Sequence, residues 1–468
     1  MPSVLDEHGS PMTGSPESAN AYNYAIDRLL RFHPDVLVAA ETLATEHSAV
    51  PMGQALIAYL HLMSTDTGDL AGAIGAAANL RETAESYREQ LHSVAIEAWL
   101  AGEWADASDA LDQVLQRWPT DLLALAIGHQ IDFFLGDAAH LRDRVGRSLI
   151  EFDQSHPHTG FVRGMHSFGL EETGQYAAAE ADGLAALDTN HDDVWAVHAV
   201  VHTYEMQGRI DDGLRFMLSR EPEWGEGNLF TVHNWWHLAL YCLEAGDRER
   251  ALSIYDDKLH HSGSAGVPIE MLDATALLWR FLLDGSDTGD RFAPLADAWA
   301  TKMIDDPWYS FNDMHAVMAN VGAGRLADAR VVLERRREFA AHASGTNGWM
   351  ARQIGIPASD AVLAFGEGRY DDVVASLVPI RRRLQQFGGS HAQRDALHRT
   401  LLEAALRSGE HDLARALTAE RIATRDTSNY NWRQRARVLR TSGDASSAAA
   451  ADARADGNRD RFAGALRD

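Results

Sequence analysis

The sequence has little cysteine and no long apolar run. Its single cysteine, Cys242, excludes an intramolecular disulfide and any zinc or iron–sulfur site built from several cysteines. No stretch reaches the ~18 consecutive apolar residues that mark a membrane-spanning helix. We therefore expect a cytoplasmic protein that has no membrane partner.

Positive charge is also scarce. The chain carries 42 Lys and Arg against 68 Asp and Glu, a formal net charge of −26 among 468 residues. Such a surface repels nucleic acid and anionic lipid, so no nucleic-acid partner is expected. The short basic segments "ERRREF" and "RRRLQQ" are interpreted as solvated helix faces.

Several catalytic and cofactor motifs are missing. There is no phosphate-binding G-x-x-x-x-G-K, so no nucleotide cofactor is expected, and no G-x-S-x-G that would mark a serine nucleophile. Cys242 has no basic neighbour in the sequence that would activate its thiol.

What the chain does have is a recurring turn. A glycine flanked by small or polar residues precedes an alanine-rich segment at intervals of 34 to 44 residues, with one interval of 78 that divides at Gly285. The turn glycines are Gly68, Gly102, Gly136, Gly174, Gly208, Gly246, Gly285, Gly324, Gly368, Gly409 and Gly443. A period that begins at 34 residues is typical of tetratricopeptide repeats.

This pattern predicts an all-α fold, an α-solenoid of about eleven antiparallel helix pairs. "WLAGEWADASDALDQVLQRWPTD" shows the tetratricopeptide pattern best. Residues 1–20, which are polar and acidic, are predicted to form a disordered lead. Residues 21–442 are predicted to form the repeat domain, and residues 443–468 a polar capping helix.

Two histidine pairs stand on neighbouring segments, in "WAVHAVVHTYEMQGR" and "HNWWHLAL". At about 100° per residue, His202 and Glu205 fall within roughly 40° of His198 on one helix face. His233 and His237 share a face for the same reason.

Other histidines lie at similar distances before a turn glycine. His166 lies 8, His198 10, His237 9 and His315 9 residues before one. The first helix of each pair lines the concave side of a tetratricopeptide array, so we expect a histidine-lined, carboxylate-bearing patch there, centred on residues 164–240. Taken singly, each histidine is more simply a hydrogen-bonded structural residue, and Trp236 a packing group.

The combined motifs are more specific than a generic repeat. The sequence contains W-x-x-H-x-x-x-H-x-x-E, H-N-W-W-H, N-D-x-H and G-G-S-x-A-Q-R-D, and with them it resembles the tetratricopeptide repeat protein 38 family. The family pattern falls on His198, His202, Glu205, His233, Asn234, Trp236, His237, Asn312, Asp313, His315, Ser390, Gln393, Arg394 and Asp395. The resemblance implies an α-solenoid and names no reaction.

One hypothesis is an enzyme that binds a small molecule and uses acid–base chemistry for hydrolysis, elimination or isomerisation. The candidate catalytic residues are His198, His202, Glu205, His237 and Asp313, with His202 and Glu205 as an acid–base pair. The candidate substrate-binding residues are His166, Trp236, Asn312, His315, Gln393, Arg394 and Asp395. Arg394 would hold an anionic group, oriented by Asp313 or Asp395.

A metal-dependent form of this site uses His198, His202, His233 and His237 as ligands, because histidines four residues apart on a helix can grip one ion. Zinc, iron or manganese would suit imidazole with carboxylate. A metal-free polar site stays open beside it. A different class of function is an adaptor whose groove binds a peptide or protein partner, the common use of such repeats.

Overall fold

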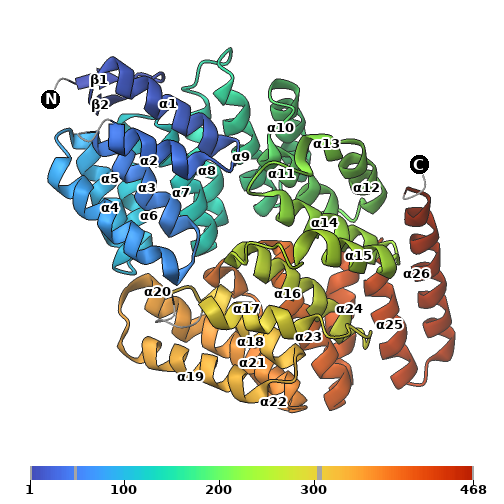
Figure 1. The fold of residues 1–468 in the computed structure, drawn as a ribbon. Coiled ribbons are helices and arrows are strands. Elements are labelled where there is room, and N and C mark those ends of the chain that lie inside the picture. Colours follow the sequence, from blue (N-terminus) through green and yellow to red (C-terminus); the bar gives the residue numbers. More distant parts are fainter. Residues whose placement is uncertain (1–2, 47–49, 303–307, 466–468) are drawn as a thin grey trace.

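The computed structural model describes residues 3–46, 50–302 and 308–465, and these residues form an almost entirely helical array (Figure 1). The only strands in these ranges are β1 (Ser3–Leu5) and β2 (Pro11–Thr13), which pair antiparallel. The all-α solenoid predicted from the repeat is confirmed. No helix in the described ranges combines the length and apolar character that crossing a bilayer requires.

Helical hairpins follow one another along the chain. In the described residues they are α3 (Pro51–Met63) with α4 (Leu70–Thr83), α5 (Tyr87–Leu100) with α6 (Trp104–Arg117), α7 (Leu122–Leu135) with α8 (Ala138–Leu149), α9 (His158–Glu172) with α10 (Tyr176–Thr189), α11 (Val194–Met206) with α12 (Ile210–Ser219), α14 (Thr231–Glu244) with α15 (Arg248–Ile254), α16 (Pro268–Leu283) with α17 (Phe292–Lys302), α18 (Ser310–Gly322) with α19 (Leu326–His342), α21 (Ile356–Gly366) with α22 (Tyr370–Leu377), α23 (His391–Ser408) with α24 (His411–Thr424), and α25 (Asn429–Thr441) with α26 (Ala445–Ala465).

The remaining helical segments join or flank these pairs. They are α1 (Pro16–Leu30), α2 (Val36–Glu46), α13 (Glu221–Trp224) and α20 (Gly345–Met350), with the 3-10 turns η1 (Thr67–Asp69) and η4 (Leu384–Phe387) and the π-helical turns η2 (Tyr255–Leu259) and η3 (Ala351–Gly355).

The turn glycines lie where the repeat placed them. Gly136 ends α7 with φ 68° and Gly174 follows α9 with φ 76°, left-handed conformations that a β-carbon penalises. Gly68 differs because it lies inside η1, between α3 and α4. The wide interval around Gly285 holds the α16–α17 pair, as predicted.

The N-terminal segment differs from the disordered lead predicted for residues 1–20. Met12 is buried, and the backbone N–H and hydroxyl of Thr13 donate to the buried carboxylate of Glu89. The side chain of Ser15 then caps α1. The polar composition gave no sign of the buried residues, among them Met12 and Thr13, or of the helix cap that order a short hairpin against α5.

The first helix of a pair is the more buried one. Twelve residues of α11 are buried but only four of α12, which exposes its other face. α26, inside the segment 443–468 for which a capping helix was predicted, packs on α25 and α12 and buries Phe462.

The array curls until late hairpins meet early ones, and α20 lies beside α6 (Figure 1). Asn312 on α18 donates to the backbone carbonyl and hydroxyl of Thr65, and the backbone N–H of Asn347 donates to the carbonyl of Gly102. In the same way α23 packs against α11 and α16. The interior is therefore filled, and the predicted concave patch is not an open groove.

Candidate functional site

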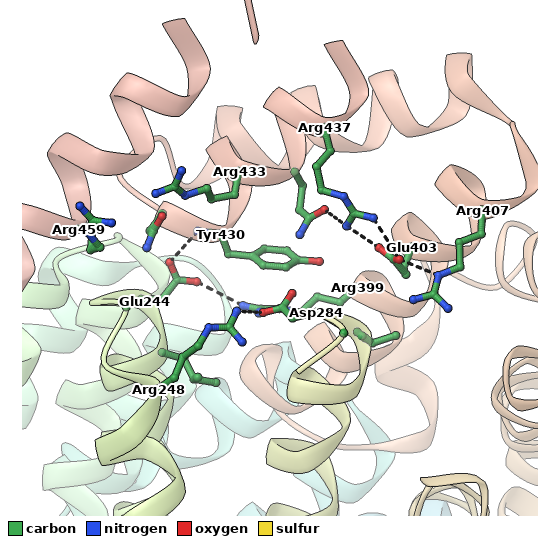
Figure 2. A pocket seen from close by; sticks show the side chains of 16 residues that line it. Glu244, Arg248, Asp284, Arg399, Glu403, Arg407, Tyr430, Arg433, Arg437 and Arg459 are labelled. Carbon is green, nitrogen blue, oxygen red and sulfur yellow. Dashed lines mark hydrogen bonds and ion pairs between the residues drawn. The ribbon is translucent and has the colours of Figure 1, made fainter. Parts of the chain in front are cut away.

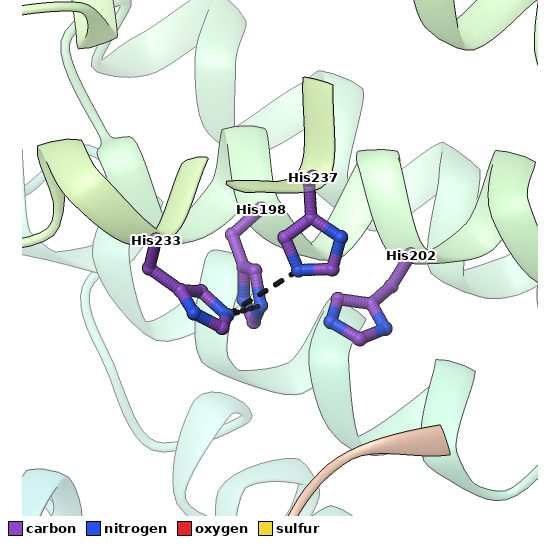
Figure 3. Close-up of side chains that lie close together, drawn as sticks. All are labelled: His198, His202, His233 and His237. Atoms are coloured by element: carbon purple, nitrogen blue, oxygen red, sulfur yellow. Dashed lines mark hydrogen bonds between the residues drawn. The ribbon is translucent and has the colours of Figure 1, made fainter. Parts of the chain in front are cut away.

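Four histidines meet in the interior between two helices (Figure 3). α11 supplies His198 and His202, and α14 supplies His233 and His237, each pair four residues apart. All four side chains are buried, and each offers a ring nitrogen that lies within 4.8 Å of the others. We call this set the histidine tetrad.

Three of the tetrad's nitrogen atoms converge closely. The Nε2 atom of His233 lies 3.1 Å from Nε2 of His198 and 3.3 Å from Nε2 of His237. His202 packs against this group, with its ring centroid 4.4 Å from those of His198 and His237.

Carboxylates orient two of the rings through their Nδ1 atoms. Nδ1 of His233 lies 2.6 Å from Oδ2 of Asp273 on α16, and Nδ1 of His237 lies 3.3 Å from Oε2 of Glu205. A carboxylate accepts, so each Nδ1 carries the proton and each Nε2 presents a lone pair to the tetrad's centre. The predicted pairing of Glu205 with His202 is replaced by pairing with His237 across the helix interface.

Burial favours the neutral form of three histidines of the tetrad. It lowers the pKa values of His198, His202 and His237 well below the ordinary value, and the neighbouring imidazoles lower them further. Neutral imidazole is the form that binds metal.

This donor set fits a transition-metal ion. With Nε2 of both His233 and His237 unprotonated, their lone pairs face each other, and a hydrogen bond from His198 can satisfy only one of them. A tetrahedral ion with metal–nitrogen distances of 2.0–2.1 Å would separate its ligand nitrogens by about 3.3–3.4 Å. The observed separations are close to that spacing.

Two further carboxylates lie beside the tetrad, at the end of α9. Oε2 of Glu171 lies 3.9 Å from Nδ1 of His202, and Glu171, Glu172 and His202 offer ligand atoms within 4.8 Å of one another. The sequence prediction missed both glutamates and Asp273. A signal for Glu171 was present, because it stands three residues before Gly174, as Glu205 stands three before Gly208.

Aromatic rings enclose the tetrad. Trp236 stacks on His233 with ring centroids 5.4 Å apart and an interplanar angle of 23°. Phe168 and Phe230 lie 5.1 Å and 5.0 Å from the His198 ring. Trp236, a candidate substrate-binding residue, thus packs on a histidine of the tetrad.

The segment 388–395 also reaches this region. Nε2 of Gln393 donates to Oδ1 of Asp273 over 3.4 Å, behind His233. Arg394 donates to Oε2 of Glu172 over 3.4 Å and to the carbonyl of Gly389. Asp395 pairs instead with Arg399 and Arg421, so it does not orient Arg394 as predicted.

Other predicted site residues are not brought to the tetrad. His166 bonds Asp182 over 2.6 Å, and Nδ1 of His315 donates to the carbonyl of Phe311 over 2.8 Å. Asp313 forms an ion pair with Arg336, and Asn312 binds Thr65. Equal distances from a turn glycine place these residues at similar positions along successive helices. However, α18 contributes contacts that close the array and does not contribute to the tetrad.

Cys242 is buried, and burial raises the pKa of its thiol to about 12. The thiol is thus held protonated, which agrees with the absence of an activating neighbour in the sequence.

Two cavities lie on the side of the tetrad where Glu205 is located. A small one, of about 10 Å³, is lined by Glu205, Glu244, Arg280, Asp395 and Arg425, among others. A cleft of about 490 Å³ lies next to it and shares Leu243, Glu244 and Arg399 with it. We call the larger one the arginine cleft, because six arginines line it (Figure 2): Arg248, Arg399, Arg407, Arg433, Arg437 and Arg459.

No known family model matches the chain. Among solved structures it is similar to the human IFIT1 dimer with PPP-AAAA (11% identity, 97% of this chain and 95% of that chain, TM-score 0.38). It is also similar to yeast Tom70 (12%, 96% and 96%, 0.36) and to Cut9 in the APC/C hetero-tetramer Cut9-Hcn1 (11%, 96% and 89%, 0.36). These are tetratricopeptide-repeat proteins. At these identities and TM-scores the likenesses do not bear on function.

Proposed function

We propose that this protein binds a divalent transition-metal ion in its interior, through the histidine tetrad. The observation that carries the proposal is the convergence of three Nε2 atoms at 3.1 Å and 3.3 Å, two of them fixed as lone-pair donors by Asp273 and Glu205. Imidazole donors favour zinc or iron, and the nearby carboxylates extend the choice to manganese. The motifs shared with the tetratricopeptide repeat protein 38 family support membership of that family.

The chemistry we propose is metal-assisted hydrolysis of a small molecule. Three histidines that hold an ion leave a position for water, and the ion lowers the pKa of that water to near neutrality. Glu205, which is 8% exposed, lines the small cavity next to His237 and is placed to accept a proton. The adjoining arginine cleft would admit an anionic substrate.

Metal content tests the first part of the proposal. Protein purified without chelator, after growth with added zinc, iron or manganese, should contain tightly bound metal by elemental analysis. His233→Gln should lose about one ion per chain. His166→Gln is the matched control, since His166 also bonds a carboxylate at 2.6 Å but lies outside the tetrad. Wild-type protein with well below one ion per chain would contradict the proposal.

Hydrolysis is tested separately, with chromogenic esters, amides and phosphoesters. Turnover should need the metal and disappear in His233→Gln. Bound metal without turnover of any of these substrates would contradict the hydrolytic part alone.

A second candidate function, a protein-binding adaptor, is supported by the arginine cleft. Only three carboxylates, Glu244, Asp284 and Glu403, line it beside the six arginines, in a chain whose net charge is −26. Arg437 at its rim is 42% exposed. An acidic peptide segment would complement this local charge.

Fluorescence polarisation with a labelled glutamate-rich peptide tests the adaptor function. Binding should weaken with added salt and be lost in Arg433→Glu/Arg437→Glu, while Arg415→Glu, on the exposed α24, should bind like wild type. Equal binding by both variants would place the interaction elsewhere.

A further inference from the structure

Glu171 is a carboxylate that the histidine tetrad does not use. It is fully buried at the end of α9, and neither of its oxygens accepts a hydrogen bond from any described group. Burial raises its pKa well above the ordinary value, and the negative charges of Glu172 and Glu205 raise it further. A carboxylate in such a place is unfavourable in the charged form unless a cation faces it.

Arg394, whose positive charge acts to lower the pKa of Glu171, is engaged elsewhere. Arg394 donates to Oε2 of Glu172 over 3.4 Å and to the carbonyl of Gly389. The same side chain also contacts Nδ1 of His391 over 3.3 Å. Glu171 is therefore left facing the His202 ring, 3.9 Å away.

Glu172 is held in place by two hydrogen-bond donors. The backbone N–H of His391, at the start of α23, donates to its Oε1 over 3.2 Å, and Arg394 holds its Oε2. These contacts fix the direction of the carboxylate while Glu171 and His202 lie beside it. The three side chains offer ligand atoms that all lie within 4.8 Å of one another.

His202 belongs to both groups of donors. It is a member of the tetrad and of the Glu171–Glu172 group, and neither of its ring nitrogens has a hydrogen-bond partner among the described residues. The three close Nε2 atoms belong to the other histidines, so His202 is free to serve the second group.

We propose that Glu171, Glu172 and His202 hold a second divalent cation next to the one in the histidine tetrad, so that the interior contains a two-metal centre. This inference rests on the proposed metal function and extends it. Mixed carboxylate and imidazole donors suit manganese, zinc or iron. Paired ions of this kind clamp the attacking and leaving oxygens in hydrolytic sites.

The two positions can be separated by counting ions. After loading with Mn²⁺ and removal of the excess, wild-type protein should hold about two ions per chain. Glu171→Gln keeps the shape of the side chain but removes its charge and should hold about one, at the tetrad. His233→Gln should also hold about one, at the second position, and the double variant none.

Electron paramagnetic resonance locates the ions relative to each other. Two adjacent Mn²⁺ ions should give an exchange-coupled spectrum, which either single variant should convert to that of an isolated ion. This readout excludes a contribution from His8, His156 and His158, a separate group of potential ligands near the N-terminus. An ion there would add to the count without producing coupling.

The outcomes distinguish the two proposals. If Glu171→Gln matches wild type in both count and spectrum while His233→Gln loses an ion, the second position is refuted and the tetrad stands. If His233→Gln matches wild type, the tetrad proposal fails. Misfolding is checked in the metal-free state, where Glu171→Gln should melt at the same temperature as wild type or higher, because glutamine resembles the neutral carboxyl that burial favours at this position.

Discussion

The side chain of Asp273 orients the ring of His233. It accepts a hydrogen bond from Nδ1 of His233 at 2.6 Å and another from Gln393, so it fixes the ring without entering the tetrad. We expect Asp273→Ala to weaken metal affinity by about 10–100-fold, the usual effect of removing such a partner. Competition with a chromophoric chelator measures the change.

A matched control is available in Asp182, which bonds His166 at the same 2.6 Å away from the tetrad. Asp182→Ala should leave the affinity at its wild-type value. Equal losses in both variants would show that the effect of Asp273 is a general one on stability.

Helical spacing was sufficient to predict which histidines share a face, because four residues make about one turn. It could not pair Glu205 with His237 or find Asp273, since both contacts cross between helices whose packing the sequence does not display. Glu171 was not predicted as a site residue for a different reason. A lone glutamate near a helix end is normally a solvated group, and only closure of the array buries it.

Among the turns between helices, two glycines differ in how closely other atoms surround them. Gly136 and Gly174 both have positive φ, but a β-carbon at Gly136 would lie 1.7 Å from the carbonyl oxygen of Gln385, whereas at Gly174 nothing lies within 4 Å. Gly174→Ala should therefore cost only the left-handed penalty of about 1–2 kcal/mol. Gly136→Ala should cost clearly more, measured by urea unfolding. Equal losses of stability in the two variants would mean that η4 does not closely contact the turn at Gly136.

Arg88 joins the N-terminal hairpin to the helical array. Its guanidinium donates to Asp121 over 2.6 Å and to the carbonyl of Pro11 and the hydroxyl of Tyr22, both over 3.2 Å. Burial acts to raise the pKa of Asp121, but Arg88 and His92 outweigh it and hold that pKa well below its ordinary value.

This pair predicts a pH dependence of stability. Because the folded pKa of Asp121 is depressed, its stabilisation is fully present above the unfolded value of about 3.9 and is lost as pH falls below it. Asp121→Asn should lower the free energy of unfolding at pH 7 by about 3 kcal/mol, since the buried Arg88 would keep only Asp6, 3.0 Å away, as a carboxylate partner. Urea unfolding at several pH values should show the variant and wild type converging in acid. A constant difference down to pH 3 would contradict this.

The glycine repeat predicted the eleven helix pairs because ten of the eleven turn glycines, all but Gly68, share a left-handed backbone conformation. The β-hairpin at residues 3–13 was missed, since strands of three residues carry almost no periodicity and their order depends on Glu89 and Arg88, far along the chain.

Closure is the main property of the whole molecule. A compact chain of this length has a radius of gyration of about 23 Å, and an open solenoid is clearly larger. Small-angle scattering should give a value near the compact one. An elongated profile would contradict the contacts of Asn312 with Thr65 and of Asn347 with Gly102.

The period of the repeat alone did not predict this curvature. The longer intervals indicated an irregular array, but its path depends on packing angles between successive pairs, which follow from side-chain volumes at every interface.

The contacts between early and late hairpins also determine when the early hairpins can be completed during synthesis. The chain from Pro51 to Arg117 contains the first two hairpins, yet their partners on α18 and α20 are made only after about two hundred further residues. At ribosomal rates of about 5–20 residues per second, the early hairpins wait about 10–40 seconds with one side unpaired. During that interval the surface that later closes the array is exposed to solvent.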